Sequence, residues 1–381
     1  MLGASMSSVA APLQEYQQGV QLAQSGDLGS AIAVFQRVIR SGDREAAPRA
    51  ARDLGLAFKM LGDMHSARAA YENAADSGHP DVAPIAAREL GLLSKGMGDS
   101  EGAITAYRRA IQSRHPEAAP TAANNLGNLL SDMGDADGAI SAYQYAVESR
   151  HPEAGPGSAR QLGYLLEQRG DFSGARDAYL FAVNSGDPDQ APRAAAFLGD
   201  LLRQQGDVEG ARAALQQSID SGHPDAAPYA WCWLGLLLDQ IGDKRSAQSA
   251  LRQAMLSGHP EAAPPAALQL ALALQDGGDI AGAREAFRRA MTSSHHQVAG
   301  QAAIKLATML AGQNDMPGAA DACQFAIGSG HPDAAPRAAV ILGILRTQQG
   351  DIASARAAYQ YAIASGHEGA GRQAANHLRE L

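Results

Sequence analysis

A Gly-Asp pair returns every 36 residues along this chain, ten times without an insertion or a deletion. An alanine follows each aspartate by four positions, and only Asn314 replaces the glycine. A fixed period of this length indicates a repeat protein, in which each unit is one supersecondary element stacked on its neighbours. The aspartates that set the register are Asp27, Asp63, Asp99, Asp135, Asp171, Asp207, Asp243, Asp279, Asp315 and Asp351.

Each unit has the pattern of two amphipathic helices. In residues 48–63, Ala51, Leu54 and Phe58 recur at three- and four-residue steps, which place them on one face of a helix. Gly62 is expected to end this helix, because glycine adopts the left-handed conformation at little cost. Asp63 is then suited to cap a second helix over residues 64–78. One such pair cannot bury both of its faces, so neighbouring pairs must stack.

The segments between units follow the pattern SGHPDAAP, as at residues 221–228. The glycine ends one helix, and the proline after the histidine cannot continue it. The acidic residue is expected to cap the next helix or to favour its N-terminal dipole. The recurring histidines are His79, His115, His151, His223, His259, His295, His331 and His367, and Asp43 and Asp187 replace them in two units.

These histidines are expected to have a structural role in the turn. Copies one repeat apart lie about 10 Å from each other if helices stack at usual distances. Metal ligands lie about 2 Å from one ion, so neighbouring copies cannot share a metal. A pH-sensitive packing or interface role is the alternative. His295 and His296 are the one adjacent pair at which a metal site would have two imidazoles.

Composition and charge narrow the class of protein. The 381 residues carry a formal net charge of −9, so nonspecific binding to nucleic acid or to an anionic membrane is not expected. We find no apolar run of about 18 residues, as a transmembrane helix would need. The start, MLGASMSSVAAP, does not have the pattern of a secretory signal. Two cysteines without disulfide or metal spacing favour a reducing compartment, and we expect a cytoplasmic protein.

The pattern resembles the tetratricopeptide repeat (TPR) family. In the seventh unit, the positions of the family motif are held by Trp231, Leu234, Gly235, Leu238, Ala247, Leu251, Ala254 and Pro260. TPR units usually have 34 residues, and the two additional residues here fall in the turn between units. The unit length and sequences such as AAYENAADSGH also resemble Sel-like repeats, although the bare Gly-Asp link favours TPR.

The resemblance implies an all-α fold, a right-handed α-solenoid of ten TPR-like helix-turn-helix repeats plus a C-terminal capping helix. Residues 1–11 are expected to form a flexible N-terminal segment. Residues 12–371 form the ten gap-free repeats, and residues 372–381 form the capping helix.

The sequence contains no recognisable catalytic motif. We find no nucleophile elbow, phosphate loop, dinucleotide fingerprint or cluster of metal ligands. Cys323 occupies the core position held by Tyr71 in the second unit, so it is expected to be a buried apolar residue. We therefore expect neither enzyme activity nor a cofactor or metal.

The first helix of each pair lines the concave groove in TPR proteins, and some of these proteins hold a peptide carboxylate there with Lys, Arg and Asn. Arginine can bind a carboxylate through two parallel hydrogen bonds, and an asparagine amide can grip a peptide backbone. The resemblance carries this role to Arg49, Arg52, Lys59, Arg88, Lys95, Asn124, Asn125, Asn128, Arg160, Tyr164, Arg193 and Arg203.

The alternative is a solvated face of internal ion pairs. Acidic residues interleave with the basic ones and are able to neutralise them. These residues are Asp53, Glu89, Asp132, Glu167 and Asp200.

The seventh unit differs from the others by its aromatic residues. Tyr229 and Trp233 fall on its first helix and are candidates for an apolar contact with a partner, because aromatic anchors concentrate binding energy. Packing between units is the alternative for Trp233. Trp231 matches the core position of the family and is expected to be buried.

These observations predict a protein–protein interaction scaffold or adaptor that binds an extended peptide or a helix in its concave groove. The expected partner is another protein or peptide, with an acidic peptide favoured by the basic groove residues. The alternative is a structural module that self-associates through the solenoid ends and has no peptide ligand.

Overall fold

The computed structural model describes residues 4–381, with side chains from Ala11 onward. This part of the chain forms 21 helices and no strand. It divides into two compact units, residues up to Ala194 and residues from Ala195, and the division falls inside helix α11. The prediction of an all-α fold of ten helix pairs plus one terminal helix is confirmed.

The first unit contains ten complete helices and the start of α11. They are α1 (Ala4–Gln24), α2 (Leu28–Arg40), α3 (Ala46–Met60), α4 (Met64–Asp76), α5 (Val82–Gly96), α6 (Ser100–Gln112), α7 (Ala118–Asp132), α8 (Ala136–Glu148), α9 (Ala154–Gln168), α10 (Phe172–Asn184) and α11 (Gln190–Gln204).

The second unit contains the rest of α11 and ten further helices. They are α12 (Val208–Asp220), α13 (Ala226–Gln240), α14 (Lys244–Leu256), α15 (Ala263–Asp276), α16 (Ile280–Met291), α17 (His296–Gly312), α18 (Met316–Gly328), α19 (Ala334–Gln348), α20 (Ile352–Ala364) and α21 (Glu368–Glu380).

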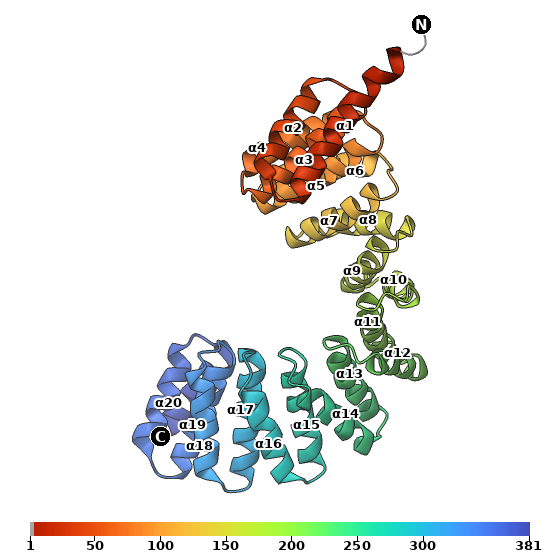
Figure 1. Ribbon diagram of the computed structural model, residues 1–381. Coiled ribbons are helices and arrows are strands. Elements are labelled where there is room, and N and C mark those ends of the chain that lie inside the picture. Colours follow the sequence, from red (N-terminus) through yellow and green to blue (C-terminus); the bar gives the residue numbers. More distant parts are fainter. Residues whose placement is uncertain (1–3) are drawn as a thin grey trace. The chain divides into compact units, whose positions relative to one another are not determined.

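Within each unit the helix pairs lie side by side in a row, as Figure 1 shows for α13 to α20. From α1 to α9 and from α13 to α21, each first helix contacts the first helix of the next pair, as α5 contacts α7 and α17 contacts α19. Within the two described units, second helices make no such contacts with one another. Packing is therefore closer on the side of the first helices, so each unit curves toward this side.

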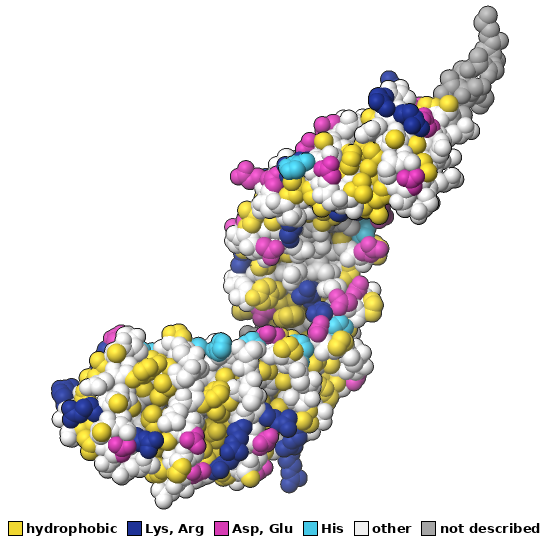
Figure 2. All heavy atoms as spheres, turned by 60° about the vertical axis from the view of Figure 1, so that its left-hand side comes forward, with side chains coloured by type: hydrophobic (Ala, Val, Ile, Leu, Met, Phe, Trp, Pro, Cys, Tyr) yellow, Lys and Arg dark blue, Asp and Glu magenta, His cyan; other side chains and the backbone are white. Residues whose placement is uncertain are grey.

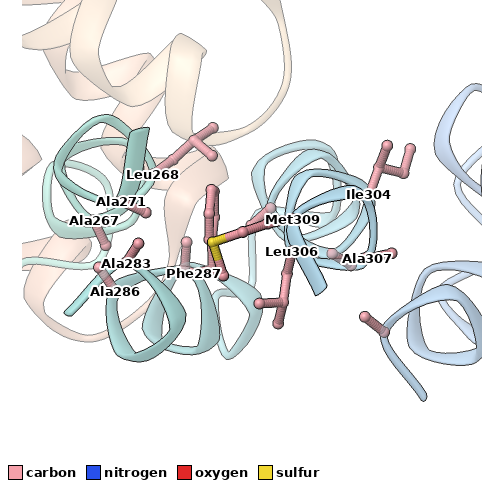
Figure 3. Packing of buried hydrophobic residues seen from close by; sticks show 14 of the residues in the cluster. Ala267, Leu268, Ala271, Ala283, Ala286, Phe287, Ile304, Leu306, Ala307 and Met309 are labelled. Carbon is pink, nitrogen blue, oxygen red and sulfur yellow. The ribbon is translucent and has the colours of Figure 1, made fainter. Parts of the chain in front are cut away.

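The two helices of a pair approach closely because a glycine of the first faces a large side chain of the second. A Cβ atom added to Gly163 of α9 would lie 2.6 Å from the ring of Tyr179 in α10, which is fully buried. The same contact recurs as Gly127 with Tyr143. In the eighth repeat Phe287 of α16 takes the position of the tyrosine, and Ala271 takes that of the glycine. Figure 3 shows Phe287 close to Met309 of α17 in a core otherwise rich in alanine.

The aspartate of every Gly-Asp pair caps the second helix, as predicted. The Oδ1 atom of Asp63 accepts a hydrogen bond of 3.0 Å from the Ser66 amide, and the other nine aspartates make the equivalent contact. The hydrogen bonds from Ser66 lower the pKa of Asp63. The preceding Gly62 has a φ of +80°, and Asn314 takes the same left-handed conformation, which asparagine tolerates.

The turn between repeats corrects one expectation, because the histidine and not the acidic residue caps the next helix. The Nδ1 atom of His151 accepts hydrogen bonds of 3.2 Å from the amides of Glu153 and Ala154. Glu153 has α-helical backbone angles, and its side chain makes no cap hydrogen bond. Asp43 accepts from the two corresponding amides through Oδ1, which explains why aspartate replaces histidine there.

In five turns the acidic residue instead lies close to the histidine of the following repeat, which is His79, His151, His259, His295 or His367. Glu117 lies 2.9 Å from Nε2 of His151, and Asp333 lies 3.0 Å from Nε2 of His367. An imidazole that accepts at Nδ1 and donates from Nε2 is neutral and has one defined tautomer. Each such histidine therefore joins a helix cap to the preceding repeat, which supports its predicted structural role.

The two ends of the solenoid differ. Helix α1 begins at Ala4 and includes Pro12, so it covers most of the predicted N-terminal segment. Residues 1–3 lie outside the described residues, and the flexibility of this segment stays a prediction. At the other end α21 packs Ala370, Ala374 and Leu378 against the last pair. The capping helix starts at Glu368, four residues before the predicted boundary, and His367 is its N-cap, with Nδ1 accepting a hydrogen bond from the Ala370 amide.

We predict that Gly163→Ala destabilises the protein by about 1–3 kcal/mol, because the added methyl group must displace the buried Tyr179 ring. The measurement is the shift in the urea midpoint followed by circular dichroism. Gly96→Ala is the control, since a Cβ there meets no atom within 4 Å. Equal midpoints for the two variants would contradict the close helix contact.

We predict that His151→Ala costs about 0.5–2 kcal/mol of stability, the usual value of a lost N-cap. His151→Asp should retain most of that stability, because aspartate makes the same two contacts at Asp43 and Asp187. Thermal unfolding at neutral pH distinguishes the two variants. An aspartate variant as unstable as the alanine variant would show that the cap is not what the histidine contributes.

Candidate functional site

Basic residues of the first helices are mostly paired with the interleaved acidic ones. Arg52 lies 2.7 Å from Asp53, Arg88 lies 2.6 Å from Glu89, and Lys95 lies 3.4 Å from Asp132. The remaining pairs are Arg49 with Glu45, Arg193 with Asp189 and Arg203 with Asp200. Figure 2 likewise shows basic and acidic side chains intermixed over the surface that it displays.

Lys59 is one exception among the predicted basic residues, and Arg160 on α9 is the other. Its Nε donates to Oε1 of Gln190 at 2.9 Å, and Nη1 donates to Oε1 of Gln161 at 3.2 Å. Both acceptors are neutral amides, and Arg160 forms no ion pair with a described residue. Burial and then the nearby charge of Arg193 lower the pKa of Arg160, and the charge of Asp189 opposes this shift only in part.

Three asparagines of α7 lie on the same face, one repeat before Arg160. Oδ1 of Asn124 accepts from the Ser158 hydroxyl at 2.9 Å, and Oδ1 of Asn128 accepts from the Tyr143 hydroxyl at 2.7 Å. Asn125 makes no hydrogen bond to a described residue. The hydroxyl contacts orient both amides so that their Nδ2 donors are not used within the described chain.

The other two predicted residues of the first unit lie at its surface. Lys59 is half-buried and forms no ion pair with a described residue. The Tyr164 side chain is exposed. Glu167, the remaining interleaved carboxylate, accepts a hydrogen bond of 3.0 Å from the Tyr179 hydroxyl.

In the second unit the predicted aromatic residues form one cluster. The rings of Tyr229 and Trp233 stack with centroids 5.5 Å apart, and Phe197 lies 5.6 Å from Trp233. Both Tyr229 and Trp233 are half-buried, so part of each ring is accessible. Trp231 was expected to be buried, but it is half-buried and lines a surface cavity of about 320 Å³. The cavity is also lined by the turn residues Gly222, His223 and Pro224 and by the end of α14.

A small apolar cavity in the first unit was not anticipated from the sequence. It has a volume of about 280 Å³ between α1, α2 and α3, and Leu56 and Met60 are among the residues that line it. Leu56 is 48% exposed and Met60 is 64% exposed. Leu56 holds the same position in its repeat as Asn128 and Tyr164, so aligning the units by position would have identified it.

The described residues do not form a reactive centre that we can recognise. No group of three or more His, Cys, Asp or Glu side chains in this part of the chain could hold a metal ion. Cys232 and Cys323 are free and buried, and burial raises the pKa of each thiol to about 12. Between residues 4 and 381, no helix has the length and apolar character that crossing a membrane requires.

The fold and this surface define an all-α repeat protein whose first helices present polar and aromatic side chains along one face. Family models agree with this class. A model described as tetratricopeptide repeat matches residues 16–83, 52–116, 88–159 and 160–230, and one described as tetratricopeptide repeat-like domain matches residues 237–379. The chain belongs to the tetratricopeptide repeat family, whose members generally mediate protein–protein interactions and are typically non-catalytic.

One solved structure supports the fold, and two others show a weaker likeness. The chain is 19% identical to c5321, a protective antigen of uropathogenic Escherichia coli strains displaying an SLR fold, with a TM-score of 0.57 over 92% of this chain and 76% of that one. PilF of Pseudomonas aeruginosa is 19% identical, with a TM-score of 0.43 over 62% of this chain and 98% of that one. MamA is 20% identical, with a TM-score of 0.37 over 46% of this chain and 91% of that one. No match was found among the curated proteins.

We predict that both thiols resist alkylation in the folded protein. A thiol with a pKa of about 12 has almost no thiolate at pH 8, and only the thiolate reacts. Iodoacetamide followed by intact-mass measurement should add no label at pH 8, and two labels after unfolding in guanidinium. Rapid labelling of the folded protein would show that a cysteine is accessible and reactive.

Proposed function

We propose that this protein is an interaction scaffold that binds an extended polypeptide on the face of its first helices, with the principal contact at α7 and α9. The proposal rests on one observation. Arg160 has a half-buried guanidinium without an ionic partner, next to a row of asparagine amides whose donors are not used. General family behaviour supports interaction with a protein.

The chemistry of these groups favours a carboxylate and a peptide backbone. A carboxylate would supply the opposite charge that Arg160 lacks, through charge-assisted hydrogen bonds. The Nδ2 groups of Asn124 and Asn128 can donate to backbone carbonyls, and Asn125 can both donate and accept. Together they fit the last residues of a peptide, or an acidic side chain within one.

The remaining predicted residues have secondary roles in this proposal. The paired residues Arg49, Arg52, Arg88, Lys95, Arg193 and Arg203 line the surface but are already neutralised, so each is expected to contribute little to binding an acidic ligand. Lys59 and Tyr164 extend the surface to either side of the principal contact. Tyr229 and Trp233 supply an aromatic contact in the second unit. A cytoplasmic location, favoured by two unpaired cysteines, is part of the same proposal.

The second candidate is a structural module that self-associates and has no peptide ligand. Its supporting observation is at the N-terminal helix, where Leu13 is 38% exposed. This candidate predicts a mass that rises with concentration, whereas the peptide-binding proposal requires no such change.

The test is affinity selection of a random library of peptides of roughly twelve residues, about 40 Å when extended, each with a free C-terminal carboxylate. Selected peptides should bind the Arg160→Ala variant at least about tenfold more weakly, since one lost charge-assisted hydrogen bond costs about 1.5–3 kcal/mol. Asn128→Asp should weaken binding as well, because it keeps the Tyr143 contact but removes the Nδ2 donor.

The matched control is Arg109→Ala, which removes an arginine of the second helix α6 that pairs with Asp76. Circular dichroism must show that every variant remains folded. Peptides that bind wild type and Arg160→Ala equally would contradict the proposed contact. Failure to select any peptide, together with multimers in sedimentation, would favour the self-associating module.

A further inference from the structure

We infer that the apolar cavity between α1 and α3 holds one large apolar side chain of the same peptide whose carboxylate binds Arg160. The ligand is therefore a peptide with a phenylalanine, leucine or methionine about seven to nine residues before its C-terminal carboxylate. This inference rests on the proposed function and adds the spacing between two anchors.

The walls of the cavity are suited to an apolar group. It encloses about 280 Å³ and is lined by side chains such as Val20, Phe35 and Met60, with Gln24 and Asp53 as its polar members. An apolar cavity of about 150 Å³ already accepts benzene, so this one has room for a large side chain. Exposed Leu56 and Met60 leave apolar surface in water that a bound side chain would cover.

The one charged group of the cavity is already neutralised. Both Tyr16 and Arg52 bind the carboxylate of Asp53, the hydroxyl at 2.7 Å and the guanidinium at 2.7 Å. Burial, together with the contact with Asp53, raises the pKa of Tyr16 to about 12, so Tyr16 remains a hydrogen-bond donor at neutral pH. Asp53 therefore does not require a cation from the ligand, which leaves an uncharged side chain as the fitting occupant.

The cavity and the Arg160 contact belong to one continuous face. Leu56, Leu92 and Asn128 hold the same position in three successive repeats, on α3, α5 and α7. Leu92 is 37% exposed, so apolar surface continues from the cavity toward the asparagines. The first helices α3, α5, α7 and α9 contact one another in sequence, so no other element lies between the two anchors along this row.

The spacing between the anchors follows from helix packing. The cavity edge is on α3 and Arg160 is on α9, three first-helix steps away. Packed helices lie about 8–10 Å apart, so the anchors are about 24–30 Å apart. An extended peptide rises about 3.3 Å per residue, and about seven to nine residues cover this distance.

The experiment uses fluorescein-labelled peptides of glycine and serine with a free C-terminal carboxylate and one phenylalanine, which is moved from about three to about twelve residues before the C-terminus. Fluorescence anisotropy against the full chain gives the affinity of each peptide. We expect an optimum at about seven to nine residues, with roughly tenfold tighter binding than at either extreme, and loss of binding when the carboxylate is amidated.

Met60→Ser combined with Leu56→Ser should remove the optimum but keep the dependence on the carboxylate. Both residues are exposed, so the variant is expected to fold. Leu61→Ser is the matched control, because Leu61 is 57% exposed but does not line the cavity.

The results of this experiment distinguish the apolar anchor from the proposed function. Affinity that depends on the carboxylate but not on the position of phenylalanine would overturn the apolar anchor and keep the proposed function. An optimum that survives the double serine variant would also overturn it. Loss of self-association in that variant would assign the cavity to a second copy of the chain. Absence of any carboxylate-dependent binding would contradict the proposed function itself.

Discussion

The close contact between a glycine of one helix and a large side chain of its partner is the constraint on which this structure depends. At Gly163 a single methyl group would enter the ring of Tyr179, and the same arrangement recurs along the chain. Because the helix pairs are held so closely, alanine is sufficient to fill much of the core. The Gly-Asp turn then fixes the orientation of each second helix, since glycine permits the reversal and aspartate caps the helix after it.

The turn between repeats uses a polar side chain to connect neighbouring units. Histidine accepts two backbone amides at Nδ1 and contacts a carboxylate of the preceding repeat through Nε2, as His151 does with Glu117. These directional contacts add to the apolar packing between neighbouring repeats. The charges of the turn are thus engaged in connecting repeats, and the binding surface has to be sought on the first helices.

Some basic side chains on the face of the first helices are paired with carboxylates and others are not. This difference is the basis of the specificity that we propose for a peptide ligand. Most of these arginines are paired with a carboxylate of the chain, as Arg52 and Arg88 are. A paired arginine therefore contributes little free energy to the binding of an acidic ligand. Arg160 donates its hydrogen bonds to amide acceptors only, which is why we propose that its charge is available to a ligand. The apolar cavity beside Leu56 lies at the other end of the same row of helices. A peptide that satisfies both would be recognised by spacing as well as by charge.

Sequence alone determined the class of fold. The repeat of 36 residues indicates stacked helix pairs, and Asp63 and its nine equivalents mark where each second helix begins. It also indicated which helix faces carry Arg88, Asn124 and Arg160. Tertiary structure decided which of these residues are already paired: the glutamine acceptors of Arg160 include Gln190 from the next repeat, and no local pattern predicts that contact. It likewise decided that His151 caps the helix instead of Glu153, since the outcome depends on backbone angles within the turn. The cavity beside Met60 exists only because three helices leave space there, and a pattern read along one helix cannot show such a space.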